Sequence, residues 1–240
     1  MKVNFGGFIP LSTVDWFGCA VCTVFLRGCP VRCTYCHNRE IQDGEDYREV
    51  EEVVEMIRSS RMLVSGVVFS GGEPTQQKEP LLMLTAASRE MGLKVGIQTN
   101  GVFPETLEAL LHEGLIDRVA LDLKARWERY DNLLKKKFTR NIRRSLTLCR
   151  TAYQERALQE FEIVVTLFRG YEDEVKYIAG ELEGETIVLQ QGVEGTLPPL
   201  TSAEMRQIAD RLGREVKIRT REEGEVVYDG RRDRRIPGKR

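Results

Sequence analysis

Short apolar runs alternate along this chain with segments whose apolar residues recur at helical spacing. Val50, Val53 and Ile57 occupy positions i, i+3 and i+7, which lie on one face of a helix. Between such segments we predict strands at Val21–Leu26, Val67–Ser70, Val95–Gln98, Val119–Leu123, Ile163–Phe168, Ile187–Gln190 and Val216–Arg219. Strands that alternate with helices in this way are typical of an α/β fold with a parallel sheet.

The length of the chain limits how far such a sheet closes. A complete eight-stranded barrel has about 250 residues, whereas this chain has 240 residues and too few predicted strands. About six β-α units fit better, so we expect a partial (β/α)6 barrel of parallel strands. Because no internal repeat or low-complexity linker is present, we expect residues 1–230 to form a single domain with an N-terminal extension. Residues 231–240 are expected to be a mobile basic tail.

The charge balance argues against two classes of partner. Lys and Arg total 36 and Asp and Glu total 37, so no overall electrostatic attraction to nucleic acid or to a membrane is expected. The chain has no apolar stretch of the roughly 18 residues that a membrane span needs, and its first residues do not have the pattern of a signal peptide. We therefore expect a cytoplasmic protein with reduced thiols.

Three of the six cysteines, Cys29, Cys33 and Cys36, have C-x3-C-x2-C spacing in a loop after the first core strand. Reduced thiols this close together favour metal binding or catalysis over disulfides. Three thiolates are one fewer than the four that complete a structural zinc site or an ordinary iron–sulfur cluster. A zinc knuckle would need a fourth ligand, and His37 is adjacent to Cys36, which strains chelation of one ion. An iron–sulfur cluster with one iron lacking a protein ligand would have room for a cofactor.

Other candidate residues follow the ends of the predicted strands, which meet at one edge of a parallel sheet. They are Gly71, Gly72 and Glu73 after the second strand, Thr99 and Asn100 after the third, Asp122 and Lys124 at the fourth, and Gln190 at the sixth. Glycines allow close approach of a ligand to the backbone, and a carboxylate binds a cationic amino group strongly. Two structural readings remain open: Gly71–Pro74 as a strand-to-helix turn, and Asp122 with Lys124 as an ion pair at the edge.

Together these motifs resemble a known family. The segment Gly28–Asn38, followed by Ser70–Pro74, resembles the radical S-adenosylmethionine (SAM) superfamily. Within it, Val14–Gly18 and Leu121–Lys124 resemble the activases of glycyl-radical enzymes. The opening Phe5–Asp15 is similar to the subgroup that activates anaerobic ribonucleoside-triphosphate reductase.

The resemblance implies a cofactor pair. Cys29, Cys33 and Cys36 would hold three irons of a 4Fe–4S cluster, and the amino and carboxylate groups of SAM would chelate the fourth iron. An electron from a ferredoxin- or flavodoxin-type donor would then split SAM and release a 5′-deoxyadenosyl radical. The cofactors perform this step, while the protein positions them and excludes water.

The resemblance also implies roles for the residues at the strand ends. Tyr35 would pack on the adenine, the motif of Gly71, Gly72 and Glu73 would bind the amino group of SAM, and Lys124 would reach its carboxylate. Thr99, Asn100 and Gln190 would add polar contacts, Asp122 would bind a monovalent cation, and Asp15 would face the incoming substrate. Gln98 stands where activases often have an acidic residue, and the chain also departs from many relatives at Phe17 and at 19–21.

The function that the resemblance implies is activation of a partner enzyme. The radical would remove a hydrogen from a backbone glycine of a glycyl-radical enzyme, with anaerobic ribonucleotide reductase as the expected partner. One alternative is a radical SAM enzyme that acts directly on a small molecule or an RNA base. Another is a metal-binding interaction domain without catalytic activity. Cys19, Cys22 and Cys149 are interpreted as core or near-core residues.

Overall fold

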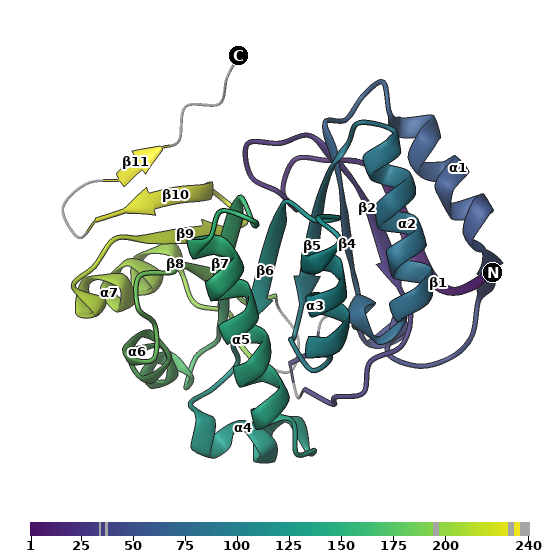
Figure 1. Cartoon of the computed structure of the whole chain (residues 1–240). Helices are drawn as coiled ribbons and strands as arrows, with labels where there is room; N and C mark the ends of the chain where they lie inside the picture. The colour runs from purple at the N-terminus through teal and green to yellow at the C-terminus, as the bar shows by residue number, and fades with distance from the viewer. Residues whose placement is uncertain (34, 37, 194–196, 230–232, 236–240) are drawn as a thin grey trace. The chain divides into compact units, whose positions relative to one another are not determined.

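The computed structural model describes residues 1–33, 35–36, 38–193, 197–229 and 233–235 (Figure 1). The chain forms two compact units. The first comprises Met1–Arg32, Asn38–Leu121 and Phe138–Phe161, and the second comprises Cys33–His37, Asp122–Lys137 and Glu162–Arg240. The expectation of a single domain stays a prediction, and most of the expected basic tail lies outside the described residues, as does His37.

The first unit is built on strands in the order β3 (Tyr47–Glu49), β1 (Lys2–Ser12), β2 (Val21–Leu26), β4 (Gly66–Gly71), β5 (Lys94–Thr99) and β6 (Arg118–Asp122). Strands β2, β4, β5 and β6 are parallel, whereas β1 runs antiparallel to both β2 and β3. The carboxyl ends of the four parallel strands therefore lie at one edge, as predicted.

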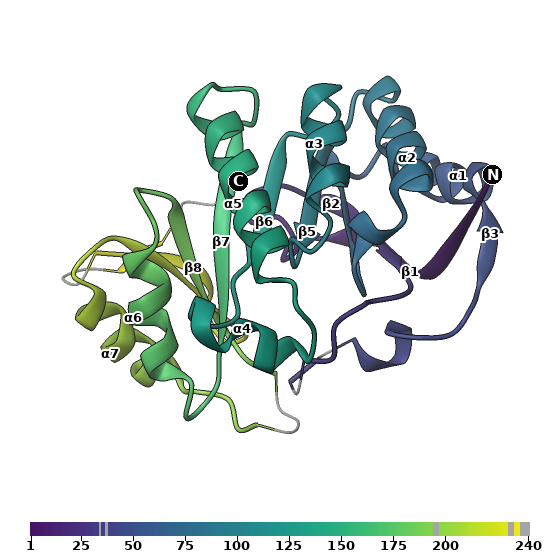
Figure 2. The same ribbon diagram turned by 60° about the horizontal axis from the view of Figure 1, so that its bottom comes forward.

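Helices cover one face of these strands. They are α1 (Val50–Ser60), α2 (Lys78–Glu90), α3 (Pro104–His112) and α5 (Thr139–Gln154), with short 3-10 turns at η1 (Arg39–Ile41) and η2 (Pro74–Gln76). Figure 2 shows α2 and α3 lying over the strands of this unit. Successive side chains of a strand point to opposite faces, so Val67 and Phe69 lie on one face and Val68 and Ser70 on the other.

The second unit contains strands in the order β7 (Glu160–Leu167), β8 (Thr186–Gln191), β9 (Val216–Thr220), β10 (Gly224–Tyr228) and β11 (Asp233–Arg235). The first two residues of β7, Glu160 and Phe161, belong to the first unit. Strands β7, β8 and β9 are parallel, and β10 is antiparallel to β9 and β11. Its helices are α4 (Trp127–Leu134), α6 (Glu172–Gly180) and α7 (Ser202–Leu212). Thr201 and Glu204 form a capping box that fixes the start of α7.

The structure confirms the α/β class and all seven predicted strands. It adds β1, β3, β10 and β11, which sequence periodicity did not reveal. Strand β1 contains Gly6, Gly7 and Pro10, which interrupt the apolar alternation, and its pairing with β2 has register shifts. Cys22 and Cys149 are fully buried, as interpreted from the sequence. Tyr153, on α5, is 43% exposed.

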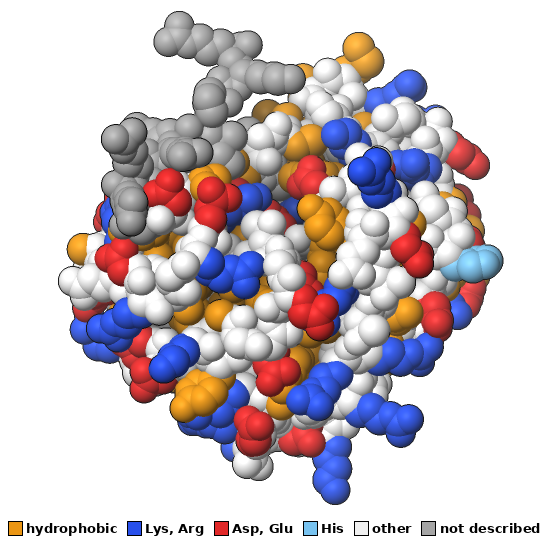
Figure 3. All heavy atoms as spheres, turned by 60° about the vertical axis from the view of Figure 1, so that its left-hand side comes forward, with side chains coloured by type: hydrophobic (Ala, Val, Ile, Leu, Met, Phe, Trp, Pro, Cys, Tyr) orange, Lys and Arg blue, Asp and Glu red, His pale blue; other side chains and the backbone are white. Residues whose placement is uncertain are grey.

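No helix among the described residues has the length and apolar character to cross a bilayer. Acidic and basic side chains are interspersed on the face shown in Figure 3. This view therefore shows no uniformly basic surface of the kind that binds nucleic acid.

Four charged side chains meet in the interior of the second unit. Glu162 on β7 and Glu225 on β10 are 4% and 2% exposed. Lys217 on β9 pairs with Glu162 and lies 3.3 Å from Glu225 Oε1, and Arg219 Nη2 lies 2.5 Å from Glu225 Oε2. Burial disfavours the charge on Lys217, but Glu162 and Glu225 outweigh it and raise the pKa of Lys217.

We predict that Lys217→Met destabilises the protein by about 3 kcal/mol, because it leaves two buried carboxylates with too little positive charge. Denaturant unfolding at neutral pH measures the loss. Lys176→Met is the matched control, since Lys176 is exposed on α6. An equal stability of the two variants would contradict a structural role for the buried network.

Candidate functional site

The cysteine loop passes from the first unit into the second between Arg32 and Cys33. At its start, the backbone N–H groups of Gly28 and Cys29 donate to Ile41 O at 2.8 Å and Gln42 O at 3.0 Å. Cys29, Cys33 and Cys36 form no disulfide, and all three have intermediate exposure. Among the described residues, no three His, Cys, Asp or Glu side chains are already arranged around one metal position.

Gly71 and Gly72 are required by the backbone of the cysteine loop. A Cβ on Gly71 would lie closer than 3.0 Å to Leu26 O, and one on Gly72 would lie closer than 3.0 Å to Gly28 O. Gly72 N also donates to Leu26 O at 2.9 Å, and Glu73 N donates to Gly28 O at 2.8 Å. The glycines were predicted to allow a close approach to the backbone. In the structure, the group that approaches them is the protein's own backbone at Leu26 and Gly28. This contact anchors Gly28, the residue that precedes Cys29.

Glu73 is a fully buried carboxylate, with 0% exposure, at the end of β4. Its Oε1 accepts hydrogen bonds from Thr75 N at 3.0 Å, from the Thr75 hydroxyl and from Thr99 Oγ1 at 2.7 Å, and its Oε2 accepts from Asn100 N at 2.7 Å. Burial raises the pKa of Glu73, and these hydrogen bonds oppose the shift. Glu73 therefore ties the end of β5 to the turn that follows β4, and its predicted contact with SAM stays a prediction.

Asn100 connects this carboxylate to the cysteine loop. Its backbone N–H binds Glu73, its Oδ1 accepts from Val102 N at 3.1 Å, and its Nδ2 lies 3.7 Å from Cys29 Sγ. Since Oδ1 is held by Val102, the amide presents its NH2 group to the sulfur. The first unit thus brings Gly71, Gly72, Glu73, Thr99 and Asn100 together with Cys29, as the shared strand edge predicts.

In the second unit, Lys124 lies beside Tyr35. Lys124 Nζ is 3.1 Å from Asp122 Oδ2 and 5.8 Å from the centroid of the Tyr35 ring. Burial disfavours the Lys124 charge, but Asp122 outweighs it and raises the pKa of Lys124. The edge ion pair, one of the readings left open by the sequence, is present in the structure.

Tyr35 also belongs to an aromatic cluster that sequence reasoning missed. Its ring centroid lies 4.9 Å from that of Phe168 and 5.8 Å from that of Tyr171. A Cβ on Gly192 would lie closer than 3.0 Å to the Phe168 ring, so Gly192 makes room for that ring. Phe168 and Tyr171 follow strand β7, and their place after a strand end is the signal that could have revealed them.

Gln190, near the end of β8, is oriented by a residue that the sequence did not single out. Its Oε1 accepts a hydrogen bond from Arg219 Nη1 at 3.2 Å. Arg219 is held in turn by Glu225, with Nε at 3.0 Å from Glu225 Oε2. This arrangement fixes which end of the Gln190 amide is the carbonyl, so its NH2 group is the end left to donate to a ligand.

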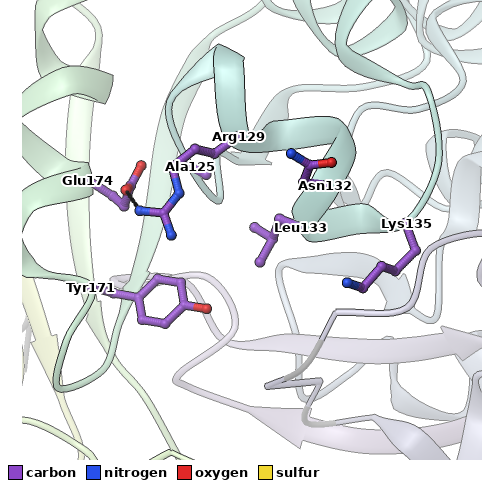
Figure 4. A pocket seen from close by; sticks show the side chains of 7 residues that line it. All are labelled: Ala125, Arg129, Asn132, Leu133, Lys135, Tyr171 and Glu174. Atoms are coloured by element: carbon purple, nitrogen blue, oxygen red, sulfur yellow. Dashed lines mark hydrogen bonds and ion pairs between the residues drawn. The ribbon is translucent and has the colours of Figure 1, made fainter.

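A pocket of about 350 Å³ opens beside α4 (Figure 4). It is lined by Ala125, Arg129, Asn132, Leu133, Lys135, Tyr171 and Glu174. Figure 4 shows the Lys135 ammonium and the Tyr171 hydroxyl pointing into it. Arg129 Nη1 lies 2.6 Å from Glu174 Oε1. Burial would raise the pKa of Glu174, but Arg126 and Arg129 lower it. The Glu174 carboxylate at the pocket wall is therefore paired with arginine. With Arg129 and Lys135 against Glu174, the lining residues carry a net positive charge.

Asp15 lies in the segment between β1 and β2 of the first unit. Its Oδ2 accepts a hydrogen bond from Thr23 Oγ1 at 2.7 Å, and its backbone carbonyl accepts one from Gln98 Nε2 at 3.1 Å. Gln98 Oε1 accepts from Ser70 Oγ at 2.8 Å. The structure thus links Asp15 to the face of β2, β4 and β5 that carries Thr23, Ser70 and Gln98.

Comparison with known proteins identifies the family. Residues 23–182, more than half of the chain, match the radical SAM superfamily. The chain therefore belongs to the radical SAM superfamily, and the resemblance seen in the sequence is confirmed.

Two similar proteins have names that describe the activation of another enzyme. A protein of Methanocaldococcus jannaschii, named as a candidate glycyl-radical enzyme activating enzyme, is 38% identical over 136 residues, 56% of this chain and 56% of that protein. The pyruvate formate-lyase 1-activating enzyme of Escherichia coli is 34% identical over 125 residues, 49% of this chain and 50% of that enzyme. The chain spans about half the length of these relatives.

A solved structure shares the fold over more of the chain. The structure of TYW1 with a lysine-pyruvate adduct bound has a TM-score of 0.60 at 15% identity, and the match covers 92% of this chain and 84% of that chain. At this level of identity, the likeness concerns the fold.

Membership of the superfamily implies a 4Fe–4S cluster and SAM, and the residues present fit both groups. The loop offers three thiols as soft ligands for iron. The Asn100 NH2 group, 3.7 Å from Cys29 Sγ, is placed to hydrogen-bond a ligating sulfur, and such bonds are a common tuning device of clusters. Lys124 supplies a buried cation suited to a carboxylate.

We predict that Gly72→Ala destabilises the protein by about 1–3 kcal/mol, because the added methyl group would overlap the Gly28 carbonyl. The iron bound per chain after anaerobic reconstitution should fall with it, since the Gly28 backbone precedes Cys29. Gly180→Ala is the control, because nothing lies within 4 Å of its added Cβ. Wild-type stability and iron content in Gly72→Ala would contradict this anchoring.

A second prediction concerns the buried carboxylate. In Glu73→Gln, the side-chain NH2 must face either Thr75 N–H or Asn100 N–H, because each carboxylate oxygen accepts one backbone N–H. We expect a loss of about 1–3 kcal/mol in the free energy of unfolding. The exposed Glu90→Gln serves as the control, and thermal unfolding compares the two variants. A loss no larger than that of Glu90→Gln would show that these hydrogen bonds do not stabilise the fold.

Proposed function

We propose that this protein is an activase that reductively cleaves SAM and generates a glycyl radical on a partner enzyme, with anaerobic ribonucleotide reductase as the partner. The observation that carries the proposal is the hydrogen-bonded link from Glu73 through Asn100 to Cys29. Within the first unit, it joins Cys29, the first cysteine of the motif, to the polar residues that follow β4 and β5. Similarity to one protein named for activating glycyl-radical enzymes and to one named for activating pyruvate formate-lyase supports the activase class.

In the proposed site, Cys29, Cys33 and Cys36 would hold the cluster, and the residues at the strand ends would hold SAM. When bound, the pair supplies a carbon-centred radical that removes a hydrogen atom from the substrate. Asn100 donates to the Cys29 sulfur, and Glu73 keeps the Asn100 backbone in place. Lys124 binds the carboxylate of SAM, and Tyr35 packs on the adenine with support from Phe168. Gln190, oriented by Arg219, donates from its NH2 group.

The charge on Lys124 suits this role. Asp122 raises its pKa, so the ammonium stays protonated at neutral pH. The ion pair also balances the Asp122 carboxylate without a further cation. A monovalent cation at Asp122 would therefore share this carboxylate with Lys124.

The pocket beside α4 supports an entrance for a protein substrate. Tyr171 lines the pocket, and its ring lies 5.8 Å from that of Tyr35 in the cysteine loop. The pocket and the proposed adenine contact are thus neighbours within the second unit. Cationic lining suits an acidic side chain of the partner. An electron donor of the ferredoxin or flavodoxin type and a cytoplasmic location complete the proposal.

The test is anaerobic incubation of the reconstituted protein with SAM, a reductant and anaerobic ribonucleotide reductase. We expect an electron paramagnetic resonance doublet from a glycyl radical on the reductase. In Cys33→Ala, the doublet, the cluster absorbance and 5′-deoxyadenosine formation should all be lost, because one of three cluster ligands is missing.

The outcomes separate the alternatives left open by the sequence. SAM cleavage without a radical on any glycyl-radical enzyme would favour direct action on a small molecule or an RNA base. One zinc per chain without sulfide would identify a metal-binding interaction domain and refute radical chemistry. SAM cleavage that survives in Cys33→Ala would show that the loop does not hold the cluster.

A further inference from the structure

The segment Thr13–Ala20, between β1 and β2, is fastened to the face of the first unit's strands opposite to Val67 and Phe69. Trp16 and Asp15 of this segment contact side chains on that face of the strands. Trp16 is 3% exposed and packs against Val21 of β2 and Val68 of β4. A Cβ on Gly96 of β5 would lie 3.1 Å from the Trp16 ring. Gly96 therefore leaves the space that the indole fills.

A buried arginine also contacts the indole. Arg118, at the start of β6, is 1% exposed, and its guanidinium lies 5.4 Å from the centroid of the Trp16 ring. Trp16 Nε1 donates to Glu160 Oε2 at 3.0 Å, and Arg118 Nε lies 4.0 Å from the same oxygen. Arg118 and Glu160 thus fix the position of the Trp16 side chain, and with it the segment Thr13–Ala20.

Two of these strands also bind the same atom of Asp15. The Asp15 backbone carbonyl accepts hydrogen bonds from Gln98 Nε2 at 3.1 Å and from Arg118 Nη1 at 3.2 Å. At the preceding turn, Ser12 Oγ accepts from the N–H groups of Val14 and Asp15, both at 3.3 Å. Hydrogen bonds therefore hold both the N–H group and the carbonyl group of Asp15.

The side chain of Asp15 makes fewer hydrogen bonds than its backbone among the described residues. Its Oδ2 accepts from Thr23 Oγ1 at 2.7 Å, and this is the one hydrogen bond of the carboxylate among the residues that the structure describes. The other oxygen, Oδ1, therefore retains its capacity to accept. Thr23 pairs with Val68 and lies three residues before Leu26, the partner of Gly71. Three residues of strand span about 10 Å. Asp15 therefore lies about that far along the strands from the edge at which β2 and β4 end.

We infer that Gln98 and Arg118 are positioning residues that clamp the Asp15 carbonyl, so that Asp15 Oδ1 receives a backbone N–H of an extended peptide substrate. This inference rests on the proposed function and names the group that the substrate must offer. A carboxylate with one free oxygen binds an amide N–H strongly. A peptide segment carries that donor next to the glycine that loses its hydrogen. Gln98 donates from its side-chain NH2 group to the Asp15 carbonyl. A carboxylate at this position could not donate that hydrogen bond.

The main test uses Gln98→Met, because this change removes the donor to Asp15 but keeps the size of the side chain. The measured quantity is glycyl radical formed on the reductase per 5′-deoxyadenosine produced. Loss of cluster or of SAM binding lowers both quantities together, so the ratio reports on substrate positioning. We expect the ratio to fall at least tenfold. In an Asp15→Ala background, the same change should have no further effect, because Gln98 acts through Asp15.

A second readout does not depend on activity. Hydrogen exchange of a peptide that covers residues 12–20 should become faster in Gln98→Met. Arg118→Lys, which keeps a charge and one donor, should fall between wild type and Gln98→Met in both measurements. Arg89→Met is the matched control. It breaks an ion pair with Asp117 in the same unit without a contact to Asp15, and it should change neither the exchange nor the ratio.

Three results would overturn the inference. They are an unchanged ratio in Gln98→Met, an equal loss from Gln98→Met with and without Asp15, and unchanged exchange of residues 12–20. A wild-type protein that cleaves SAM but forms no radical on any partner would instead refute the proposed function and, with it, the peptide substrate. The two failures are therefore distinguishable by the behaviour of the wild type.

Discussion

The site in the first unit depends on a single buried carboxylate. Glu73 is shielded from water, and both of its oxygens accept hydrogen bonds from the chain. Placing an ionised group in the interior is costly unless it is fully hydrogen-bonded. That requirement forces the end of β4, Thr99 and Asn100 into one arrangement. Asn100 then reaches Cys29 Sγ, so the condition that keeps Glu73 buried also places a donor beside the cysteine loop.

Glycine provides the second constraint on the cysteine loop. Gly71 and Gly72 allow the end of β4 to lie against the backbone of Leu26 and Gly28. The same two residues that the sequence motif offers for ligand binding are thus used first to seat the loop. A motif that looks like a set of ligand contacts is, in its observed hydrogen bonds, a device that positions other residues. This division explains why glycine and glutamate occur together directly after a strand.

Sequence reasoning was strongest where the chemistry was local. The cysteine spacing and the parallel strands were predictable because each is encoded in consecutive residues. Arg118, Phe168 and Arg219 were not predicted, because their partners are far away in the sequence and come together only through pairing of the strands. A charged residue such as Arg118 or Glu162 within or beside an apolar strand was a usable signal, since it requires a buried partner. The edge pair of Asp122 and Lys124 was foreseen because two residues apart on a strand share a face.

The central claim is that the radical formed at this site removes a hydrogen atom from a backbone glycine of a protein. The most direct measurement uses a partner reductase prepared with glycine deuterated at the α-carbon. After anaerobic reaction with SAM and a reductant, mass spectrometry of the 5′-deoxyadenosine reports the origin of the transferred hydrogen. The account predicts one deuterium in the 5′-deoxyadenosine when the labelled partner is present. Unlabelled 5′-deoxyadenosine from a reaction that consumes SAM in the presence of that partner would contradict it.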